Sequence, residues 1–425
     1  EEFADGGDGN NDRGPWFRDN FGITFSSTQS YHGRMRETTV PESGWYRIRL
    51  SAHAIDPPEG HGVWTSVRSG VCYAKAPSMF WIGSFEATEE PQIHEFTAWI
   101  EGSHMLEIRP ADYTLKRMGA RFITEETLTD PTLAKVALDW IEIERIYKGP
   151  KPAALRKLLF GDLVVEDSQL ITKQPKRDLE ALMVRFATKA FRRPVTKREL
   201  RPYVKLAQET FKDNLPFIES VRAGYRAILC SPRFFYFNEP VGKLDDYNVA
   251  SRLSYFLWGT PPDDKLLELA ANKRLTNPRV LEAQVDRMLD DSRSQAFIKN
   301  FSDQWLNLRD IDFTIPDQKL YPEYDEVLKH AMVGETHAFL REMITHNLSV
   351  THVIDSDFTM LNERIARHYG IEGVSGTHFQ KVKLKPEYRR GGIITHASVL
   401  KVTANGTTTS PVVRGVWMLE NIMGE

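Results

Sequence analysis

The N-terminal third of the chain alternates between apolar and polar residues. In the segment 44–52 every second residue is apolar and falls on one face: Tyr46, Ile48, Leu50 and Ala52. The segment 94–100 alternates in the same way, 105–109 returns after a Glu-Gly-Ser turn, and 139–144 closes the set. A period of two is typical of half-buried strands. Several short strands at this spacing predict a jelly-roll-like β-sandwich over residues 1–148.

The apolar period changes to 3.6 residues further along the chain. The segment 179–191 has one apolar stripe, which predicts an amphipathic helix. Thr196-Lys-Arg-Glu199 is a capping box for the next helix, and Asp245 or Asp246 caps a later one. Thr260-Pro261 and Asn277-Pro278 each predict an N-cap followed by Pro at the first helical position. Further helices are expected over 292–306, 324–345, 360–369 and 411–423.

These patterns predict a multidomain protein with an all-β part followed by an all-α part. The expected segments are a sandwich over 1–148, a helical segment over 149–240, a central helical domain over 241–345 and a C-terminal helical domain over 346–425. A chain of 425 residues is too long for one ordinary core, which agrees with several domains. The Tyr-Lys-Gly-Pro-Lys-Pro stretch at 147–152 is the expected linker.

Composition narrows the classes of partner. The chain is 41% hydrophobic and 27% charged, which describes a globular protein. Its 55 basic and 58 acidic residues give a formal charge of −3, so no nucleic acid is expected as a partner. No apolar run approaches the length of a transmembrane segment. The two cysteines, Cys72 and Cys230, fall in different predicted domains, so a mutual disulfide is not expected.

Six short sequence words in the helical region resemble one family. They are Arg185–Val195, Ile228–Tyr236, Ala250–Trp258, Phe358–Glu363, His368–Gly370 and Ser410–Asn421. Together they resemble large planctomycete proteins that often carry c-type cytochrome domains, over about residues 155–425. The resemblance implies no settled activity. It does imply a c-type cytochrome domain as a partner, and a periplasmic, secreted or cell-surface location.

Haem is expected only in other parts of the parent protein. Neither Cys72 nor Cys230 lies in a Cys-x-x-Cys-His motif, so this chain binds no haem covalently by itself. The chain starts at Glu1 without an initiator Met or a signal peptide, and we expect it to be the middle of a longer precursor.

The predicted sandwich resembles calcium-stabilised carbohydrate-binding modules through Gly44–Arg47 and Asp139–Ile143. This resemblance implies a structural calcium held by Asp139 with Glu1 or Glu2, because hard cations need several oxygens. The alternative is a strand-end carboxylate beside a solvated tail. A polysaccharide would need exposed aromatic platforms, and the candidates are Trp64, Trp81 and Trp99. The alternative for these rings is ordinary packing against the helical part.

Glu335 is the candidate for acid–base chemistry. It falls on the apolar stripe of its predicted helix, with Leu328, Ala331, Met332 and Phe339. A carboxyl group there has a raised pKa unless it is paired, which general acids exploit. The alternative is a buried ion pair with an arginine that holds two helices in register. The histidines are scattered, and no metal-site, phosphate-loop or nucleophile motif is present.

The last sixty residues contain a candidate anion site. Cations precede a polar loop, Asn405-Gly-Thr-Thr-Thr-Ser410, and Pro411 then opens a helix with Ser410 as its N-cap. Helix starts with free N–H groups and nearby cations bind anions. The candidate ligands are Arg389, Arg390, Thr408, Ser410 and Arg414. The alternative is that these groups only cap the helix and hold the loop.

Three functions remain open from the sequence. The first is an accessory protein, a glycan-binding-like sandwich on a helical domain that works beside a c-type cytochrome. The second is an enzyme acting on polysaccharide or its oxidised products, with Glu335 and the basic C-terminal corner in its site. The third is a structural component of the cell envelope.

Overall fold

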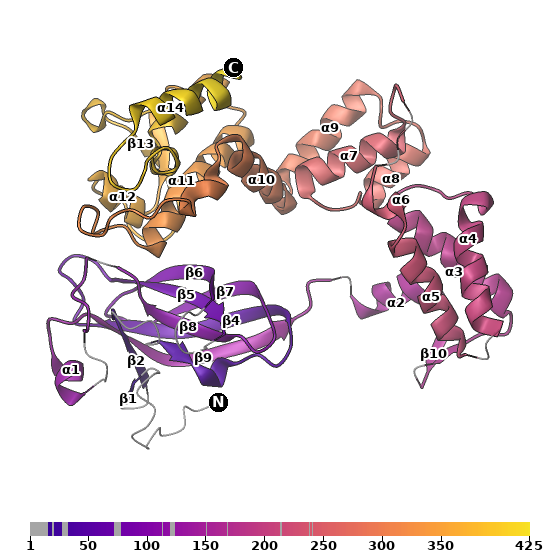
Figure 1. Ribbon diagram of the computed structural model, residues 1–425, viewed down its shortest axis with the longest axis horizontal. Helices are drawn as coiled ribbons and strands as arrows, with labels where there is room; N and C mark the ends of the chain where they lie inside the picture. The colour runs from indigo at the N-terminus through magenta and orange to yellow at the C-terminus, as the bar shows by residue number, and fades with distance from the viewer. Residues whose placement is uncertain are drawn as a thin grey trace. The chain divides into compact units, whose positions relative to one another are not determined.

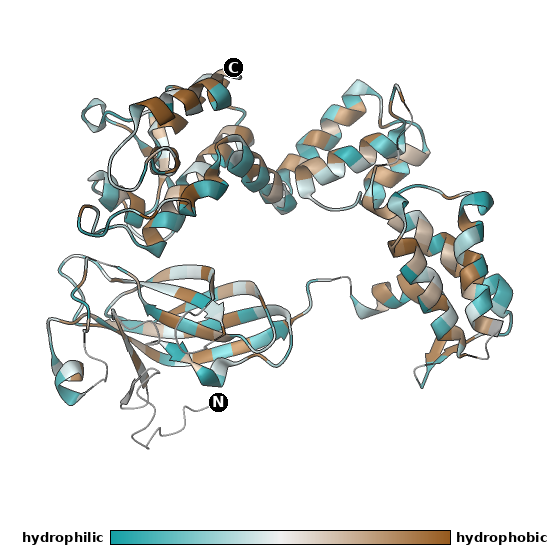
Figure 2. Cartoon of the chain, in the orientation of Figure 1, coloured by the Kyte–Doolittle hydropathy of each residue, from teal (hydrophilic) through white to brown (hydrophobic). Residues whose placement is uncertain are grey.

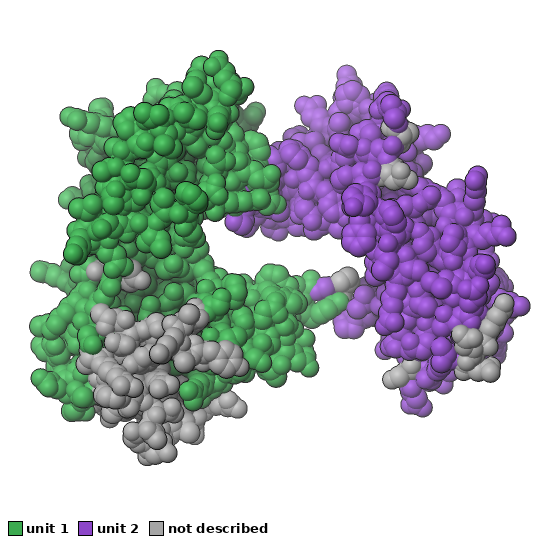
Figure 3. Space-filling view, in the orientation of Figure 1, with its two compact units in different colours: residues 1–148, 300–425 green, residues 149–299 purple. Residues whose placement is uncertain are grey.

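The computed structural model describes residues 16–18, 21–27, 33–71, 78–112, 114–119, 124–149, 151–167, 169–212, 215–237, 239 and 241–425. These residues form two compact units, coloured separately in Figure 3. Unit 1 contains residues 1–148 and 300–425, and unit 2 contains residues 149–299. Unit 1 is therefore built from two stretches of the chain that are far apart in sequence.

The N-terminal part of unit 1 is a two-sheet antiparallel sandwich, as the alternating pattern predicts (Figure 1). One sheet has the order β1-β2-β9-β4-β7, formed by Trp16–Arg18, Phe21–Phe25, Lys135–Ile146, Gly44–Ile55 and Gln92–Ile100. The other has the order β3-β8-β5-β6, formed by Arg34–Met35, Met105–Pro110, Val63–Gly70 and Met79–Ala87. A short helix, α1, spans Glu125–Thr129 before β9.

The sandwich core is formed by the apolar residues of the alternating strands. Ile48 and Leu50 of β4 are fully buried, together with Val67, Phe85 and Ile108 from the other sheet. The polar residues of the same strands face outward, where Arg47 and Arg49 of β4 pair with glutamates of β9. The alternating colours along these strands in Figure 2 follow the same division.

The C-terminal part of unit 1 is mainly helical. Its elements are α11 (Glu326–Thr345), β12 (Phe358–Leu361), α12 (Glu363–Tyr369), β13 (Gln380–Lys383), α13 (Ala397–Val402) and α14 (Pro411–Met418), the last continuing as a short π-helix to Met423. The strands β12 and β13 form an antiparallel pair. Apolar residues of α11, β12, α12 and α13 share one core, which includes Leu328, Leu361 and Ile365.

The helix α11 also packs against the sandwich. Trp64 of β5 is fully buried in a cluster with Ala111 and Val327, the second residue of α11. Trp81 of β6 stacks on His330 of α11, with ring centroids 4.0 Å apart. Figure 1 shows α11 on the side of the four-stranded sheet. One helix thus contributes to both halves of unit 1.

Unit 2 is helical, apart from the small β10–β11 hairpin. Its elements are α2 (Pro152–Phe160), β10 (Val164–Glu166), β11 (Gln169–Ile171), α3 (Pro175–Ala190), α4 (Lys197–Lys212), α5 (Phe217–Leu229), α6 (Pro232–Phe235), α7 (Asp246–Trp258), α8 (Asp264–Ala271) and α9 (Pro278–Asp290). The helix α10 (Gln295–Trp305) begins in this unit and ends in unit 1. One core joins α3, α4 and α5, and another joins α7, α8 and α9.

The predicted helix starts are mostly confirmed. Thr196 and Glu199 form the expected reciprocal hydrogen bonds, and Asp245 and Asn277 are N-caps. The prediction at Thr260-Pro261 is wrong. The helix α8 begins at Asp264, and its N-cap is Asp263, whose side chain accepts from the backbone N–H of Leu266. The carbonyl of Thr260 instead accepts the hydroxyl of Ser254, which closes the turn after α7.

The compact units divide the chain differently from the expected helical segments. The boundary at 299/300 lies inside the expected central domain 241–345. The reason is the packing of α11, which shares its core with α12, β12 and α13 and not with α7, α8 and α9.

We expect residues 149–299 to fold without the rest of the chain, because their two apolar cores are built entirely from their own helices. The isolated fragment should show helical circular dichroism and a cooperative urea transition. A fragment that is soluble only with residues 1–148 or 300–425 present would contradict this independence.

Candidate functional site

A cavity of about 310 Å³ lies in the C-terminal part of unit 1. Its walls come from the segment before α11, from α11, α12 and α13, and from the loop before α14. The acidic and basic side chains of the lining are Glu323, His368, Arg390, Lys401 and Arg414. Aromatic and apolar walls are supplied by Tyr321, Tyr324, Tyr369, Leu328, Met332 and Leu400. Two arginines and a lysine thus share the cavity with one carboxylate.

Among the residues that the structure describes, Arg390 and Arg414 form no ion pair with a carboxylate, and their partners are neutral groups. Arg390 stacks on the ring of Tyr369, with its guanidinium carbon 3.4 Å from the ring centroid, and donates to the carbonyl of Thr395 at 2.8 Å. Arg414 donates to the hydroxyls of Thr403 and Thr409. Both guanidinium groups are therefore held in position by neutral groups, without a direct ion pair.

Lys401 has a different role. Its side chain is buried, and the ammonium donates to the carbonyls of Ile311 and Thr314 and to the hydroxyl of Thr314, at 2.7 to 3.0 Å. Burial lowers the pKa of this lysine. Because all three N–H groups have acceptors, Lys401 contributes charge to the cavity but no free donor.

The loop before α14 is shaped by Asn405 and Gly406. The Asn405 side chain accepts from the backbone N–H groups of Thr407 and Thr408, which closes the loop. Gly406 has a φ of +92°, and a Cβ there would lie 2.7 Å from the carbonyl oxygen of Ile315. Only glycine fits this close approach. The loop is thereby pressed against residues 315–316, and Thr408 and Thr409 line the cavity.

Glu335 lies behind the cavity wall. Its side chain is 1% exposed, and it does not line the cavity. The hydroxyl of Thr359 donates to Oε1 at 2.8 Å, and the hydroxyl of Tyr369 donates to Oε2. The Tyr369 hydroxyl also accepts the backbone N–H of Ala397 at 2.8 Å. Tyr369 therefore joins the carboxyl group to the cavity, since its ring lies under Arg390.

Burial raises the pKa of Glu335 to about 7, and the donors from Tyr369 and Thr359 and the charge of Arg390 oppose the rise. Burial likewise raises the pKa of Tyr369 well above its ordinary value. The Nε2 of His396 lies 3.9 Å from Glu335, but burial lowers the pKa of this histidine to about 3, so it is neutral. Thr336 bonds to Nδ1 of His396 and to Ser398.

The alternative for Glu335, a direct ion pair with an arginine, is not found among the described residues: the hydroxyl groups of Thr359 and Tyr369 donate to its two carboxylate oxygens. Of the expected anion ligands, Arg390, Thr408 and Arg414 line the cavity. Arg389 is exposed and does not line the cavity, and its backbone has a left-handed φ of +50°. Ser410 is the N-cap of α14, where it accepts from the N–H of Val413, and it does not line the cavity.

Sequence reasoning missed Tyr369, Thr359 and Lys401 as parts of this site. Thr359 and Tyr369 lie in the segments Phe358–Glu363 and His368–Gly370, which resemble the family. That resemblance could have indicated both residues. Lys401 could have been found as a lysine inside the apolar run 397–402.

The three tryptophans that are candidates for glycan binding differ in how far they are exposed. Trp64 is fully buried, so its ring offers no platform to a glycan. Trp81 is covered on one face by His330. Trp99 of β7 is 50% exposed, and it meets Trp45 of β4 edge to face, with centroids 6.1 Å apart. Trp99 thus points outward, as its strand alternation predicts.

Two candidate ligands of the predicted calcium site, Glu1 and Glu2, lie outside the described residues. Asp139 accepts from the hydroxyl of Ser51 at 2.6 Å and lies 3.2 Å from Nδ1 of His53. In the described part of the chain, no group of three or more His, Cys, Asp or Glu side chains is arranged to hold a metal ion.

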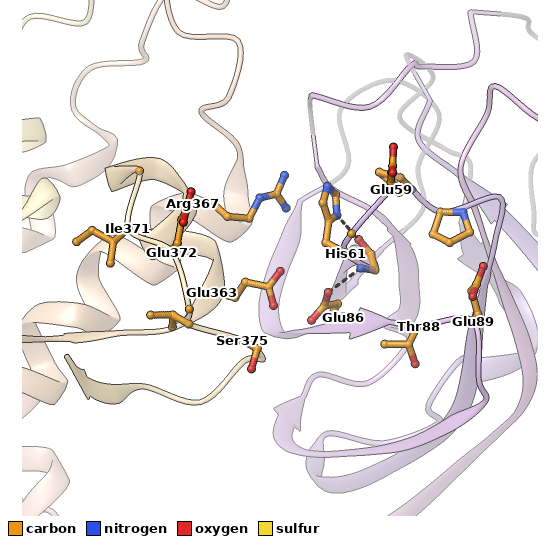
Figure 4. A pocket seen from close by; sticks show the side chains of 17 residues that line it. Glu59, His61, Glu86, Thr88, Glu89, Glu363, Arg367, Ile371, Glu372 and Ser375 are labelled. Atoms are coloured by element: carbon orange, nitrogen blue, oxygen red, sulfur yellow. Dashed lines mark hydrogen bonds between the residues drawn. The ribbon is translucent and has the colours of Figure 1, made fainter.

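A second, wider cavity of about 1010 Å³ is acidic (Figure 4). Its carboxylates come from the sandwich and from the region of α12: Glu59, Glu86, Glu89, Glu363 and Glu372. Burial raises the pKa of Glu86, and the neighbouring Glu363 adds to the rise. Backbone N–H groups of Gly62 and Gly376 donate to Glu86 and Glu363. The two cavities of unit 1 therefore differ in the sign of their charge.

Three family models match the chain. The PSD5 model, a protein of unknown function (DUF1595), matches residues 178–239. The PSD4 model, a protein of unknown function (DUF1592), matches residues 244–371. The PSCyt3 model, a protein of unknown function (DUF1588), matches residues 390–425. A search of curated proteins gave no match. In the part that the structure describes, no helix combines the length and apolar character needed to cross a membrane.

We expect Glu335 to make the free energy of unfolding depend on pH. Its pKa is about 7 when folded against an ordinary value of 4.5, so the folded state binds more protons between these values. The contribution stabilises the fold fully below pH 4.5 and is lost as the pH rises through 7, by on the order of 3 kcal/mol. Glu335→Gln should remove this loss, which urea titrations at pH 5 and pH 8 would measure.

The control is Glu342→Gln on the same helix, since Glu342 pairs with Lys381 and His346 near the surface. This variant should keep the pH dependence of the natural chain. Equal pH dependence in Glu335→Gln and the natural chain would contradict the assignment.

Proposed function

We propose that this chain, which belongs to the planctomycete family of cytochrome c-associated proteins, is an accessory component that binds a small organic anion in the cavity beside α11. The observation that carries the proposal is the convergence of Arg390, Arg414 and Lys401 on one cavity in which neither arginine has a direct carboxylate partner among the described residues. Cations without a directly paired carboxylate inside a concave site favour an anionic ligand.

The size and walls of the cavity indicate the class of anion. A volume of about 310 Å³ is at the small end of ligand sites, which suits one sugar ring or a molecule of similar size. A guanidinium group binds a carboxylate through two parallel hydrogen bonds. The tyrosine rings and Met332 offer apolar contact to the rest of such a molecule. A uronic or aldonic acid, or another compact carboxylate, combines these properties.

The acidic side of the cavity limits where a ligand can carry its negative charge. Glu323 lies 3.8 Å from His368 at the wall, and this pair reduces the positive field on that side. A ligand whose negative charge lies at the end facing the arginines therefore fits the cavity better than one that is charged on all sides.

The family resemblance supports a proposal for the cellular location and the partner. We propose a periplasmic or secreted location and a c-type cytochrome domain as the partner. Haem would be held in other parts of the parent protein. Structural calcium at Asp139 stays a prediction. No reaction is assigned to the cavity, because Glu335 reaches it only through Tyr369.

Glycan binding by the sandwich is a second candidate function, favoured by Trp45 and Trp99. They are cross-strand partners on the outer face of β4 and β7, 37% and 50% exposed, and Lys148 lies 4.0 Å from the Trp45 ring. Exposed indole rings beside polar groups are suited to stacking against sugar rings. Glu101 accepts from the indole N–H of Trp99 at 2.8 Å, which fixes the ring orientation.

We expect glucuronate to raise the melting temperature of the full chain, because a ligand that binds only the folded state stabilises it. Arg390→Gln and Arg414→Gln should each weaken the binding by about tenfold to a hundredfold, the effect of losing one charge-assisted hydrogen-bond pair. Isothermal calorimetry would measure the affinities.

Arg389→Gln is the matched control. Arg389 is adjacent in sequence and equal in charge, but it lies outside the cavity lining. Equal losses in Arg389→Gln and Arg390→Gln would show an unspecific charge effect and not a site. Absence of binding by sulfate, glucuronate and gluconate alike would overturn the proposal.

For the sandwich, Trp99→Ala and Trp45→Ala should each lower retention in affinity gels made with neutral polysaccharides, because the stacking surface is reduced. Ile93→Ala is the control, since Ile93 is 61% exposed on the same face of β7 and has no ring. Unchanged migration of both tryptophan variants, in gels that retard the natural chain, would exclude this surface.

A further inference from the structure

We propose that anion binding in the cavity is coupled to the uptake of a proton by Glu335, so that the ligand enters together with one proton. This inference rests on the proposed function and adds its regulation. The geometric basis is a continuous path: the Arg390 guanidinium stacks on the Tyr369 ring, and the Tyr369 hydroxyl donates to the Glu335 carboxylate. Tyr369 lines the cavity, whereas Glu335 is fully enclosed behind it.

The charges around Glu335 make Arg390 its counter-charge. The described titratable and charged groups facing the carboxylate are Tyr369 from α12, and Arg390 and His396 from the segment before α13. The strand β12 contributes the neutral hydroxyl of Thr359. Tyr369 and His396 are uncharged at neutral pH, because burial moves both pKa values away from 7. Arg390 is thus the one permanent cation among these groups.

One cation is therefore shared between two possible anions. When the cavity is empty, the positive charge of Arg390 favours the ionised form of Glu335. A carboxylate bound to Arg390 neutralises that charge and adds a negative charge on the far side of the Tyr369 ring. Both effects are strong where solvent screening is weak. The ionised form of Glu335 becomes unfavourable, and the carboxyl group takes a proton from solvent.

The exchange falls in a measurable range of pH. The pKa of Glu335 is about 7 in the empty site, so about half of the molecules are ionised at pH 7. If binding raises this pKa by about one unit, the uptake at pH 7 is roughly 0.4 proton per ligand, and the affinity falls about tenfold as the pH rises well beyond both pKa values.

His368 is the competing proton acceptor. It lines the cavity and lies near Glu323, and burial lowers its pKa. A bound anion also favours the protonated form of this histidine. The experiment must therefore separate the two groups.

The test is isothermal calorimetry of glucuronate and of sulfate with the full chain at pH 7, in phosphate-free buffers of different ionisation enthalpy. Neither probe changes its own charge near this pH. The dependence of the observed heat on the buffer gives the number of protons taken up. We expect uptake by the natural chain, retained binding without uptake by Glu335→Gln, and retained uptake by His368→Gln.

Tyr369→Phe provides a second variant that leaves the ring under Arg390. Without the hydroxyl donor, the ionised form of Glu335 is less favourable, so the pH of maximal uptake should rise. This expectation holds even if Glu335→Gln does not fold.

Each outcome separates the two proposals. Binding without proton uptake by the natural chain overturns the coupling and leaves the anion site standing. Uptake that persists in Glu335→Gln and disappears in His368→Gln assigns the proton to the histidine and overturns the coupling. If neither anion binds, the proposed function fails with it.

Discussion

The stack of Arg390 on Tyr369 is the interaction on which the candidate site depends. It places a cation on the cavity wall and directs the tyrosine hydroxyl to a carboxyl group that has no contact with solvent. A buried carboxylate is costly without compensation. The hydroxyl donors and the nearby guanidinium offset part of that cost, and the pKa of about 7 shows that the compensation is incomplete. The protonation of Glu335 is therefore sensitive to a change of charge in the cavity.

The helix α11 supports both sides of this arrangement. One face carries Glu335 and packs against β12, α12 and α13, while its N-terminal turns contact Trp64 and Trp81 of the sandwich. A change that displaces the sandwich therefore acts on the same helix that holds the buried carboxyl group. This gives the sandwich a structural role in unit 1 in addition to the proposed glycan binding on its opposite sheet.

The sequence alone was sufficient to predict the β and α parts of the chain and the N-caps of individual helices. Alternation identified the inward residues of β4, and the capping residues at Thr196, Asn277 and Ser410 were found from local hydrogen-bonding rules. Such rules involve residues three or four positions apart, so a short stretch of sequence is enough to apply them. The site could be predicted only in part. Glu335 and Arg390 were each identifiable, but their connection through Tyr369 depends on the packing of α12 against α11, which no local pattern encodes. For Trp64 the sequence left two alternatives open for the same reason, and the structure shows packing against the helical part, by a helix that begins at residue 326.

The divided composition of unit 1 has a consequence for synthesis on the ribosome. The sandwich ends at residue 148, and the helix that covers Trp64 begins at Glu326, after the whole of unit 2. At a usual translation rate of about 5 to 20 residues per second, the nascent sandwich waits roughly 10 to 35 seconds for α11. During that interval Trp64 and Trp81 face solvent instead of the helix. The growing chain thus carries an exposed indole surface while unit 2 folds, and a chaperone that binds apolar surfaces would bind it at this stage.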